Sequence, residues 1–460
     1  MESLELMSSA GRQRMLRQPL LTERAAAEAE YNRLQTVIDQ LNTPESQRHV
    51  STIRHQFMQM HDLHGTIANI GNHVVVDEIE LFELKSFAFL CMETAKASTA
   101  IGLDCTLAVP DMEPVFALLD PDGTRIPNFY FYDSYHPDLA PLRRRMAALQ
   151  TAIEQSAADN PGLDDMRREQ SELFERQNAI QHAVAAQLSD ALCKHHSLLC
   201  EAYDRMAYAD FLFAKAFLAT QWNLVRPVIS GGLHTSLHGL FNPRLLLFNK
   251  EHGLRYQPID IELQNGVCLI TGANMAGKTV LLKTVGIAHL MAQFGFYVPA
   301  AEASIALVDD VVFCIGDEQN EMKGLSSFAS EIIKISNALQ YSATHRLLLL
   351  IDEPARTTNP SEGKALVQSV AHILDKRSSS TLITTHYSQL GLPCRRLRVR
   401  GFVENMSDKT LTPDNINDFM DYSLLSDDSD DVPQEALRIA SILDCDRQMI
   451  ETARQFLAGN

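Results

Sequence analysis

The stretch "TGANMAGKTVLLKTVG", residues 271–286, decides the fold of the second half of the chain. A β-branched, apolar run that predicts a strand precedes it, and an amphipathic helical pattern follows it. Between strand and helix stands the spacing Gly272-x4-Gly277-Lys278-Thr279. Glycines at such a turn let backbone N–H groups point at the β- and γ-phosphates of a nucleotide, while the lysine adds a cation and the threonine offers a hydroxyl to Mg²⁺. The alternative, a chance glycine-rich turn, does not explain why both flanking elements are present.

Two further apolar runs end in polar side chains. "RLLLLIDEPAR" predicts a buried strand that ends in Asp352 and Glu353, and "STLITTHYSQL" predicts another that ends in His386. A carboxylate at a strand's end beside a phosphate loop can hold Mg²⁺, and the carboxylate after it can polarise an attacking water. A histidine there can position the γ-phosphate, although a capped surface histidine is the simpler reading of His386 alone. Together these residues predict Mg²⁺-dependent nucleotide hydrolysis.

The composition is that of a globular protein with more than one domain. The 460 residues are 45% apolar and 21% charged, and no apolar run reaches the roughly 18 residues of a membrane span. The N-terminus lacks the order of a secretory signal, and the eight cysteines lack paired spacing, which together predict a cytoplasmic protein without membrane partners. The net charge of −18 gives the chain no overall attraction to the phosphate backbone of nucleic acids.

The pattern changes about halfway along the chain. Residues 1–228 are mostly helical in pattern, and residues 229–432 alternate short apolar runs with glycine-bearing turns. Residues 433–460 read as two amphipathic helices, which either dimerise or pack as a terminal hairpin within one chain. The predicted fold is therefore an α/β P-loop domain preceded by a mostly α-helical domain.

The helical half contains a candidate lever. One apolar stripe stops at "DNPG", and a second stripe with a spacing of seven suggests one long helix. An intramolecular helical hairpin fits these stripes better than a coiled coil with a partner. The first stripe is Leu142, Met146, Leu149 and Ile153; the second is Met166, Leu173 and Ile180, followed by Leu192, Leu199, Met206 and Phe213, with the spacing of seven kept within each of these two runs.

Four motifs, in this order, resemble the ATPase domain of the MutS family, which is built like the ABC ATPases: "TGANMAGKT", "FCIGDEQNEMKGLSSFASEI", "LLLIDEPARTTNPSEG" and "TLITTHYSQL". The resemblance runs from about residue 240 to about residue 390, and it implies ATP as the nucleotide and a composite site between two subunits. In that site the implied roles are ATP binding for Gly272, Asn274, Gly277, Lys278 and Thr279, Mg²⁺ and water for Asp352 and Glu353, and a switch histidine for His386.

The same resemblance implies that Ser326 and Ser327 of "GLSSFASE" reach the γ-phosphate held by the partner subunit, which would be a second copy or a MutS-like paralogue. A turn that begins a helix offers N–H and hydroxyl donors to an anion. A simple helix N-cap at Ser326 is the alternative explanation of the same residues. The sequence departs from the family where Ala355 and Thr357 replace glycines around Arg356 and where Ala273 replaces a proline. Thr357 predicts slow hydrolysis.

The N-terminal half resembles the MutS core more weakly, through "LFELKSFAFL", "FALLDPDGTRIPNFYFYDSYHPDLAPLRRRM" and "EAYDRMAYADFLFAKAFLATQWNLVRPVI". It lacks the Phe-x-Glu wedge of the family's mismatch-reading domain, since Phe82 and Glu83 are adjacent, as are Phe174 and Glu175. "GDEQ" and "NPSEG" are typical of the paralogue branch with an added nuclease domain, which we do not expect here. The sequence thus predicts a short MutS-like protein without either domain.

Two functions of different classes remain open. The first is a dimeric ATP-hydrolysing switch that binds mismatched or branched DNA in repair or recombination. The second is an ATP-driven remodeller, because short MutS-like proteins resemble factors that reactivate adenosylcobalamin-dependent amino-acid (lysine) mutases. The first is the more common function within the MutS family, and we prefer it. The acidic charge, the missing mismatch-reading domain and the short lever favour the second. A metal held by Cys193, His196, Cys200 and Asp204 is disfavoured, because their spacing matches no common zinc pattern.

Overall fold

The structure is a computed structural model that divides by packing into two compact units, Met1–Gln18 with Arg33–Phe217 and Pro19–Asn32 with Leu218–Asn460. Of the three unit boundaries, one follows α1 (Ser9–Leu16) at Gln18, one falls inside α2 (Arg24–Leu41) and one inside α10 (His196–Gln221). The predicted domain limits of 1–228, 229–432 and 433–460 remain predictions. The residues described are 4–156, 161–272, 277–315, 327–403, 418–427 and 445–458, with residues 429, 437, 440 and 441.

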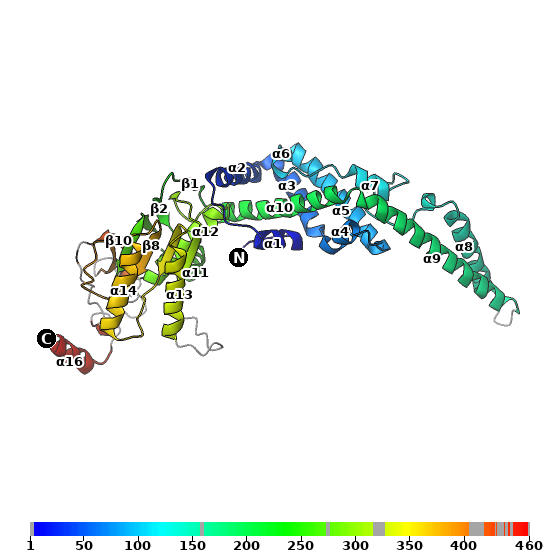
Figure 1. Cartoon of the computed structure of the whole chain (residues 1–460). Helices are drawn as coiled ribbons and strands as arrows, with labels where there is room; N and C mark the ends of the chain where they lie inside the picture. The colour runs from blue at the N-terminus through cyan, green and yellow to red at the C-terminus, as the bar shows by residue number, and fades with distance from the viewer. Residues whose placement is uncertain are drawn as a thin grey trace. The chain divides into compact units, whose positions relative to one another are not determined.

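The described part of the first unit is built from helices (Figure 1). Besides its shares of α2 and α10, these are α1 Ser9–Leu16, α3 Gln47–Gln59, α4 His64–Gly71, α5 Glu78–Ala100, α6 Asp104–Leu107, α7 Glu113–Leu119, α8 Leu139–Gln155 and α9 Leu163–Cys193, with short 3₁₀ turns at Pro44–Ser46 and Asp133–Tyr135.

The core of this unit forms where α3, α5 and α10 pack together. The Asp77 side chain and the Glu80 side chain cap each other's backbone N–H groups and so fix the start of α5. Within the core, the buried Lys85 ammonium donates to Asp120 at 3.0 Å and to the Tyr132 hydroxyl at 2.6 Å. This ion pair ties "LFELKSFAFL" to "FALLDPDGTRIPNFYFYD", the two segments that resemble the start of the MutS core.

The lever is a hairpin of α8 and α9, which lie side by side as the stripes predict (Figure 1). Arg145 on α8 and Glu169 on α9 form a two-bonded ion pair across it. The long helix expected from the second stripe is divided, because α9 ends at Cys193 and α10 begins at His196. The N–H groups of Lys194 and His195 bond three residues back, to Ala191 and Leu192, so the helical ladder tightens and stops there.

The second unit contains a six-stranded sheet in the order β10-β9-β4-β8-β7-β6, in which β10 alone is antiparallel to its neighbour. The α/β class expected for this half of the chain is therefore confirmed, and its larger sheet is mostly parallel. The strands are β4 Gly266–Thr271, β6 Asp310–Cys314, β7 Leu347–Ile351, β8 Ser380–Thr384, β9 Arg395–Phe402 and β10 Met420–Ser426.

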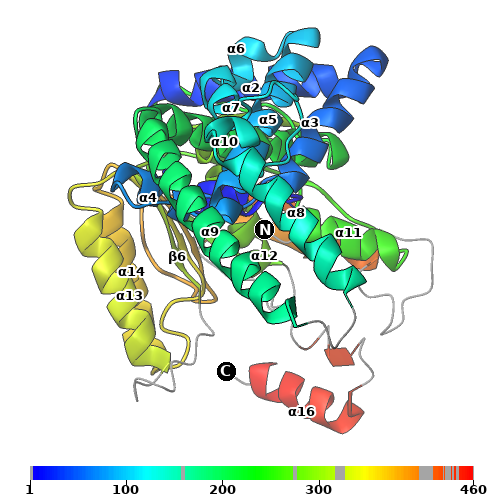
Figure 2. The same ribbon diagram turned by 90° about the vertical axis from the view of Figure 1, so that its right-hand side faces the viewer.

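Helices cover both faces of this sheet because alternate strand residues point to opposite sides. Cys268, Ile270, Leu348 and Leu350 pack in one core with α12 (Lys278–Gln293). Val267, Leu269, Leu347 and Leu349 pack in the other core with α13 (Ser327–Tyr341) and α14 (Pro360–Leu374). These two helices contact each other; they are drawn next to each other in Figure 1 and overlap in the view of Figure 2. Fully buried strands of this kind explain the continuous apolar runs in the sequence.

The second unit also contains a smaller sheet in the order β1-β5-β2-β3. Its strands are β1 Val228–Ile229, β2 Thr235–Leu240, β3 Ile259–Leu263 and β5 Glu302–Ile305. The remaining described helices of the unit are α11 Pro243–Glu251 and α16 Arg447–Ala458. The segment Pro19–Asn32 joins this unit through the end of α12. The Tyr31 hydroxyl donates to the Ala292 carbonyl and the Leu21 N–H to the Gln293 carbonyl, both at 2.7 Å. Within the described residues, none of the helices has the length and apolar character needed to cross a membrane.

Candidate nucleotide site

The carboxyl ends of three neighbouring parallel strands form the site. Gly272 follows β4, Thr384 ends β8 and Asp352 follows β7, and the register pairs Ile270 with Thr384 and Ile351 with Ile383. Since carboxyl ends of parallel strands meet at one edge of a sheet, residues more than a hundred positions apart become neighbours there. In open α/β sheets this edge is where ligands bind.

The turn from β4 into α12 needs its glycines. Gly277, directly before the helix, has φ +75°, a left-handed conformation that side chains with a Cβ rarely adopt. It stands at the N-cap of α12 and supplies no side-chain cap to the helix. Residues 273–276 lie outside the described residues. They include Asn274, a predicted nucleotide ligand, and Ala273, which stands where the MutS family has a proline.

Lys278 directs its ammonium back across this turn. The side chain is only 5% exposed, and Nζ donates to the Gly272 carbonyl at 2.7 Å. Nζ also lies 3.3 Å from Glu353 Oε1, which forms an ion pair between the lysine of the loop and the carboxylate after β7. A buried ammonium held by a carbonyl and a carboxylate is placed to exchange these partners for phosphate oxygens.

Asp352 accepts a hydrogen bond on each carboxylate oxygen. Thr279 Oγ1 donates to Oδ2 and Thr384 Oγ1 donates to Oδ1, both at 2.6 Å. Hydroxyl and carboxylate oxygens are the hard ligands that Mg²⁺ takes, usually one or two from the protein with the rest from water and phosphate. The side-by-side oxygens of Thr279 and Asp352 therefore fit Mg²⁺.

Glu353 occupies a strained position. Its φ is +41°, which is costly for a residue with a Cβ, and its N–H donates to Thr384 Oγ1 at 2.9 Å. One of its carboxylate oxygens faces Lys278, and the other lies 3.5 Å from Arg356 Nη1. The strained backbone thus turns a carboxylate between two cations at the strand edge.

A second strained residue, Ala355, follows at φ +61°. Its N–H donates to Glu331 Oε1 on α13 at 3.0 Å, and its carbonyl accepts from the Tyr387 hydroxyl at 2.9 Å. Of the two departures from the family's glycines, Ala355 is the one in a glycine-like conformation, whereas Thr357 is not among the residues with positive φ. The strained backbone of this turn is therefore at Ala355, and the slow hydrolysis expected from Thr357 stays a prediction.

His386 is exposed at the strand edge beside these charges. Its partial desolvation, the largest effect, lowers the pKa of its imidazole; the Glu353 carboxylate raises it, and the Lys278 and Arg356 cations lower it further. The balance favours the neutral ring, which can both donate and accept a hydrogen bond. The ring also lies against Tyr387, with centroids 4.2 Å apart.

The two predicted serines cannot be placed in the same way. Ser326 lies outside the described residues, and Ser327 begins α13 with a side chain that is not described. The sequence did not indicate three residues that position this site. Thr384 hydrogen-bonds to Asp352 and to the Glu353 N–H, and Glu331 and Tyr387 hydrogen-bond to the backbone of Ala355. The one signal for Thr384 is its place two residues before His386, at the strand's end.

The predicted cysteine and histidine stripe is divided between two helices. Cys193 ends α9 and lies 3.7 Å from His73, while His196 pairs with Cys200 on α10 at 3.5 Å. Among the described residues, no three His, Cys, Asp or Glu side chains are grouped as metal ligands would be.

Comparison with known proteins agrees with this geometry, since residues 268–459 match the family described as MutS domain V. This part of the chain is similar to MutS domain V. The resemblance to the MutS family that the four motifs indicate is thereby confirmed.

Curated relatives carry the name Endonuclease MutS2. The protein from Agathobacter rectalis is 37% identical over 229 residues, which are 49% of this chain and 28% of the relative. The protein from Caldanaerobacter subterraneus subsp. tengcongensis is 32% identical over 308 residues, which are 64% of this chain and 36% of the relative. The chain thus spans about a third of the length of the curated relatives it matches.

Proposed function

We propose that this chain binds ATP with Mg²⁺ at the edge of the six-stranded sheet and hydrolyses it, and that the nucleotide state switches a MutS-like dimer that binds DNA. The observation that carries the proposal is the pair of bonds to Asp352 from Thr279 and Thr384, with Lys278 buried alongside. These contacts join the phosphate loop, the carboxylate strand and the histidine strand in one place. The MutS domain V match and the relatives named Endonuclease MutS2 support it.

Each residue then has a task during hydrolysis. Lys278 and the N–H groups that begin α12 bind the β- and γ-phosphates, and Thr279 and Asp352 hold Mg²⁺, which neutralises charge on the phosphates. Glu353 orients a water molecule and takes its proton as the water oxygen bonds to the γ-phosphorus and the bond to the ADP oxygen breaks. Neutral His386 donates a hydrogen bond towards the γ-phosphate.

The remaining assignments complete a composite site. Asn274 would contact the nucleotide, and Ser326 and Ser327 would reach the nucleotide of a second copy or of a MutS-like paralogue. The other hypothesis, a remodeller of an adenosylcobalamin-dependent mutase, gains no support from the comparisons, whose relatives are named for endonuclease activity. The DNA assay below separates the two.

Two variants test the nucleotide site. Lys278→Ala should abolish ATP binding in isothermal titration, because the phosphates lose a buried cation. Glu353→Gln should still bind ATP, while phosphate release falls about 10²-fold or more. Glu362→Gln, an exposed change in the first turn of α14, is the matched control and should keep full turnover. Normal turnover in Glu353→Gln would remove Glu353 from its role.

A gel-shift comparison tests the DNA part of the proposal. Mismatched, branched and fully paired duplexes should be compared at low and at physiological salt, with ATP and with ADP. Binding that depends on DNA structure and on the nucleotide supports the switch. Equal or absent binding under all conditions, in a protein that still hydrolyses ATP, would favour a protein client instead.

A further inference from the structure

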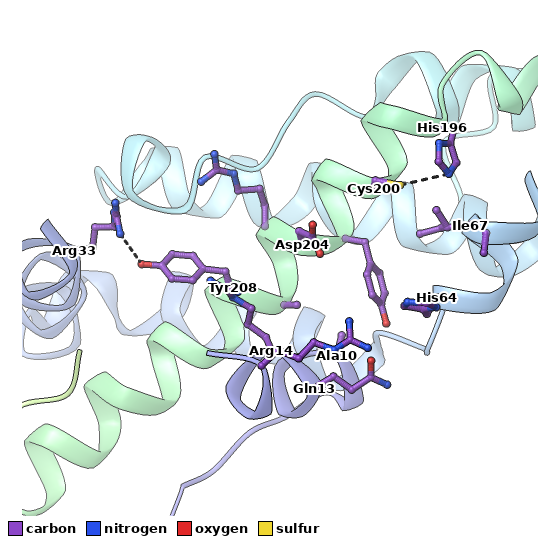
Figure 3. Close-up of a pocket in the computed structure, with 15 residues that line it drawn as sticks. Ala10, Gln13, Arg14, Arg33, His64, Ile67, His196, Cys200, Asp204 and Tyr208 are labelled. Carbon is purple, nitrogen blue, oxygen red and sulfur yellow. Dashed lines mark hydrogen bonds between the residues drawn. The ribbon is translucent and has the colours of Figure 1, made fainter. Parts of the chain in front are cut away.

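A cavity of about 670 Å³ in the first unit is lined by basic side chains (Figure 3). Four of its lining residues are arginines: Arg14, Arg17, Arg33 and Arg205. Among the lining residues that the structure describes, Asp204 is the sole acidic one. This local surplus of positive charge is notable in a chain with 58 acidic and 40 basic residues.

The wall of the cavity is fixed in place. Asp210 on α10 is 1% exposed and accepts from the N–H and the hydroxyl of Ser8, at 2.8 Å and 2.6 Å, just before α1 begins. Gly11 packs so closely on this carboxylate that an added Cβ would lie 2.2 Å from Asp210 Oδ2. Helix α1 is therefore clamped to α10, which holds Arg14 at the cavity.

Two arginines meet at one aromatic ring in this wall. The guanidinium carbons of Arg14 and Arg33 each lie 5.9 Å from the centroid of the Tyr208 ring. Arg33 Nη1 also donates to the Tyr208 hydroxyl at 3.3 Å. Cation–π contacts of this kind orient guanidinium groups without neutralising them, so the charge of Arg14 stays available to a ligand.

Histidines stand at the opposite end of the cavity from Arg33 and Tyr208 (Figure 3). His64 begins α4 and His196 begins α10. His196 packs tightly on Gly71, where an added Cβ would lie 2.5 Å from Nε2. Two imidazoles add further hydrogen-bond donors to a site already rich in them.

The Asp62 carboxylate, next to the cavity wall, already accepts three hydrogen bonds. Asp62 accepts from Gln13 Nε2, from the Tyr203 hydroxyl and from the His64 N–H, each at 3.1 Å. The backbone bond from His64, together with those from Tyr203 and Gln13, lowers the pKa of this carboxyl against the opposing effect of burial. Within the described residues, Arg14, Arg17 and Arg205 form no ion pair. Four guanidinium groups gathered with the single lining carboxylate of Asp204 repel one another, a cost that a bound anion would reduce.

We propose that this cavity binds a small phosphate-bearing anion of up to nucleotide size, at a site separate from the nucleotide site of MutS domain V. The volume is within the range of small-ligand pockets, about 300 to 1,000 Å³. Guanidinium groups match phosphate through paired N–H donors, and the tyrosine and histidine rings offer flat surfaces to a base or sugar. The site needs neither ATP hydrolysis nor a second subunit.

The test uses the full chain carrying Lys278→Ala, so that the other nucleotide site is disabled. Isothermal titration without Mg²⁺ should show one molecule of AMP, or of pyrophosphate, bound per chain, and binding that weakens as salt is raised. Adding Arg14→Gln and Arg205→Gln should weaken this binding by about tenfold or more, because each arginine supplies charge-assisted hydrogen bonds. Adenosine, which lacks phosphate, should not bind.

A matched control lies on the same helix. Arg12→Gln removes the same charge from α1 at an exposed position that does not line the cavity, and should leave binding unchanged. Thermal melting shows that each variant folds, and Arg205→Gln alone provides a milder change if the double variant does not. Absence of binding at millimolar AMP or pyrophosphate, or equal binding in all variants, overturns the proposal. Binding of short oligo-dT but of neither small anion also overturns it and assigns the cavity to nucleic acid.

Discussion

Glu331 and Ala355 are joined by one hydrogen bond, in which the Ala355 N–H donates to Glu331 Oε1 at 3.0 Å. The bond connects α13, which begins at the serine motif, to the strained turn that follows Glu353. Burial raises the pKa of Glu331, and the bond from Ala355 and the charge of Arg356 act in the opposite direction. A half-buried carboxyl tied to a strained peptide is suited to hold that peptide in place.

The first prediction concerns this bond. Glu331→Ala should reduce ATP turnover about tenfold with a smaller change in ATP affinity, because the loop that carries Glu353 loses an anchor worth roughly 1 to 3 kcal/mol. Glu331→Gln keeps an acceptor oxygen and should retain most of the activity. Steady-state phosphate release gives kcat and KM for both. If the two variants lose activity equally, the charge of Glu331 matters and the hydrogen bond does not.

The second prediction concerns Thr384. Its hydroxyl donates to Asp352 and accepts from the Glu353 N–H, so a single oxygen positions both carboxylates. Thr384→Val removes that oxygen at nearly constant volume and should lower kcat roughly 10- to 100-fold and raise the Mg²⁺ concentration needed for half-maximal rate. Thr384→Ser keeps the hydroxyl and serves as the control. Similar rates in the valine and serine variants would remove Thr384 from the site's support.

The limits of sequence reasoning are clear at these residues. Lys278, Asp352 and Glu353 stand out because their motifs are local, with strand, turn and polar residues adjacent in the chain. Thr384 and Glu331 carry no such pattern, since their roles arise only when β7, β8 and α13 pack together. The strands β7 and β8 were predicted from their buried apolar runs.

The positions of other segments depended on contacts between residues distant in the sequence. The lever was expected to continue as one helix, but two backbone N–H groups near His195 bond three residues back and divide it. Residues 19–32 belong to the second unit because Tyr31 bonds to Ala292, a contact across 261 positions that no periodicity reveals.

A third prediction concerns stability and pH. His289 on α12 is buried, and its Nε2 lies 2.8 Å from the Ala306 carbonyl, so the neutral ring donates there. Burial, opposed by this bond, lowers its pKa from 6.5 to about 4. Because the unfolded chain takes up the proton first, stability should fall as pH drops from 6.5 towards 4, by at most about 3 kcal/mol.

Urea unfolding at several pH values measures this effect. His289→Gln, which does not titrate, should show a weaker loss of unfolding free energy on acidification than the unaltered chain. His252→Gln changes an exposed histidine and should leave the pH dependence as it was. An unchanged slope in His289→Gln would show that another group causes the acid sensitivity.

The fourth prediction concerns assembly through the tail. Helix α16 exposes three apolar side chains, with Met449, Phe456 and Leu457 54%, 74% and 56% exposed. If these residues form a dimer contact, Met449→Glu with Phe456→Glu, or removal of residues 433–460, should shift the protein towards monomer and slow turnover per subunit. Gln448→Glu with Gln455→Glu adds the same charge on the same helix and is the control. A persistent, fully active dimer in sedimentation would place the interface elsewhere.

The final prediction concerns DNA and rests on the charges of the lever hairpin. Arg143 pairs with Asp133, Arg145 with Glu169, and Arg176 with Asp138, so these arginines are already matched by carboxylates. A protein that neutralises Z phosphates shows a log–log salt slope of about −0.9Z for duplex DNA. We therefore expect any DNA binding to be roughly micromolar or weaker at physiological salt, with a shallow slope that implies few phosphate contacts.

A triple variant tests whether the hairpin contacts DNA. Changing Arg143, Arg144 and Arg145 to Glu should leave ATP turnover nearly unchanged, because these residues lie in the first unit and the proposed catalytic carboxylates in the second. It should also change DNA affinity little, since at least two of the three arginines already face acidic partners. Fluorescence anisotropy over a series of salt concentrations measures affinity and slope together. Nanomolar, mismatch-preferring binding that collapses in the triple variant would contradict this expectation and identify α8 and α9 as the DNA-contacting surface.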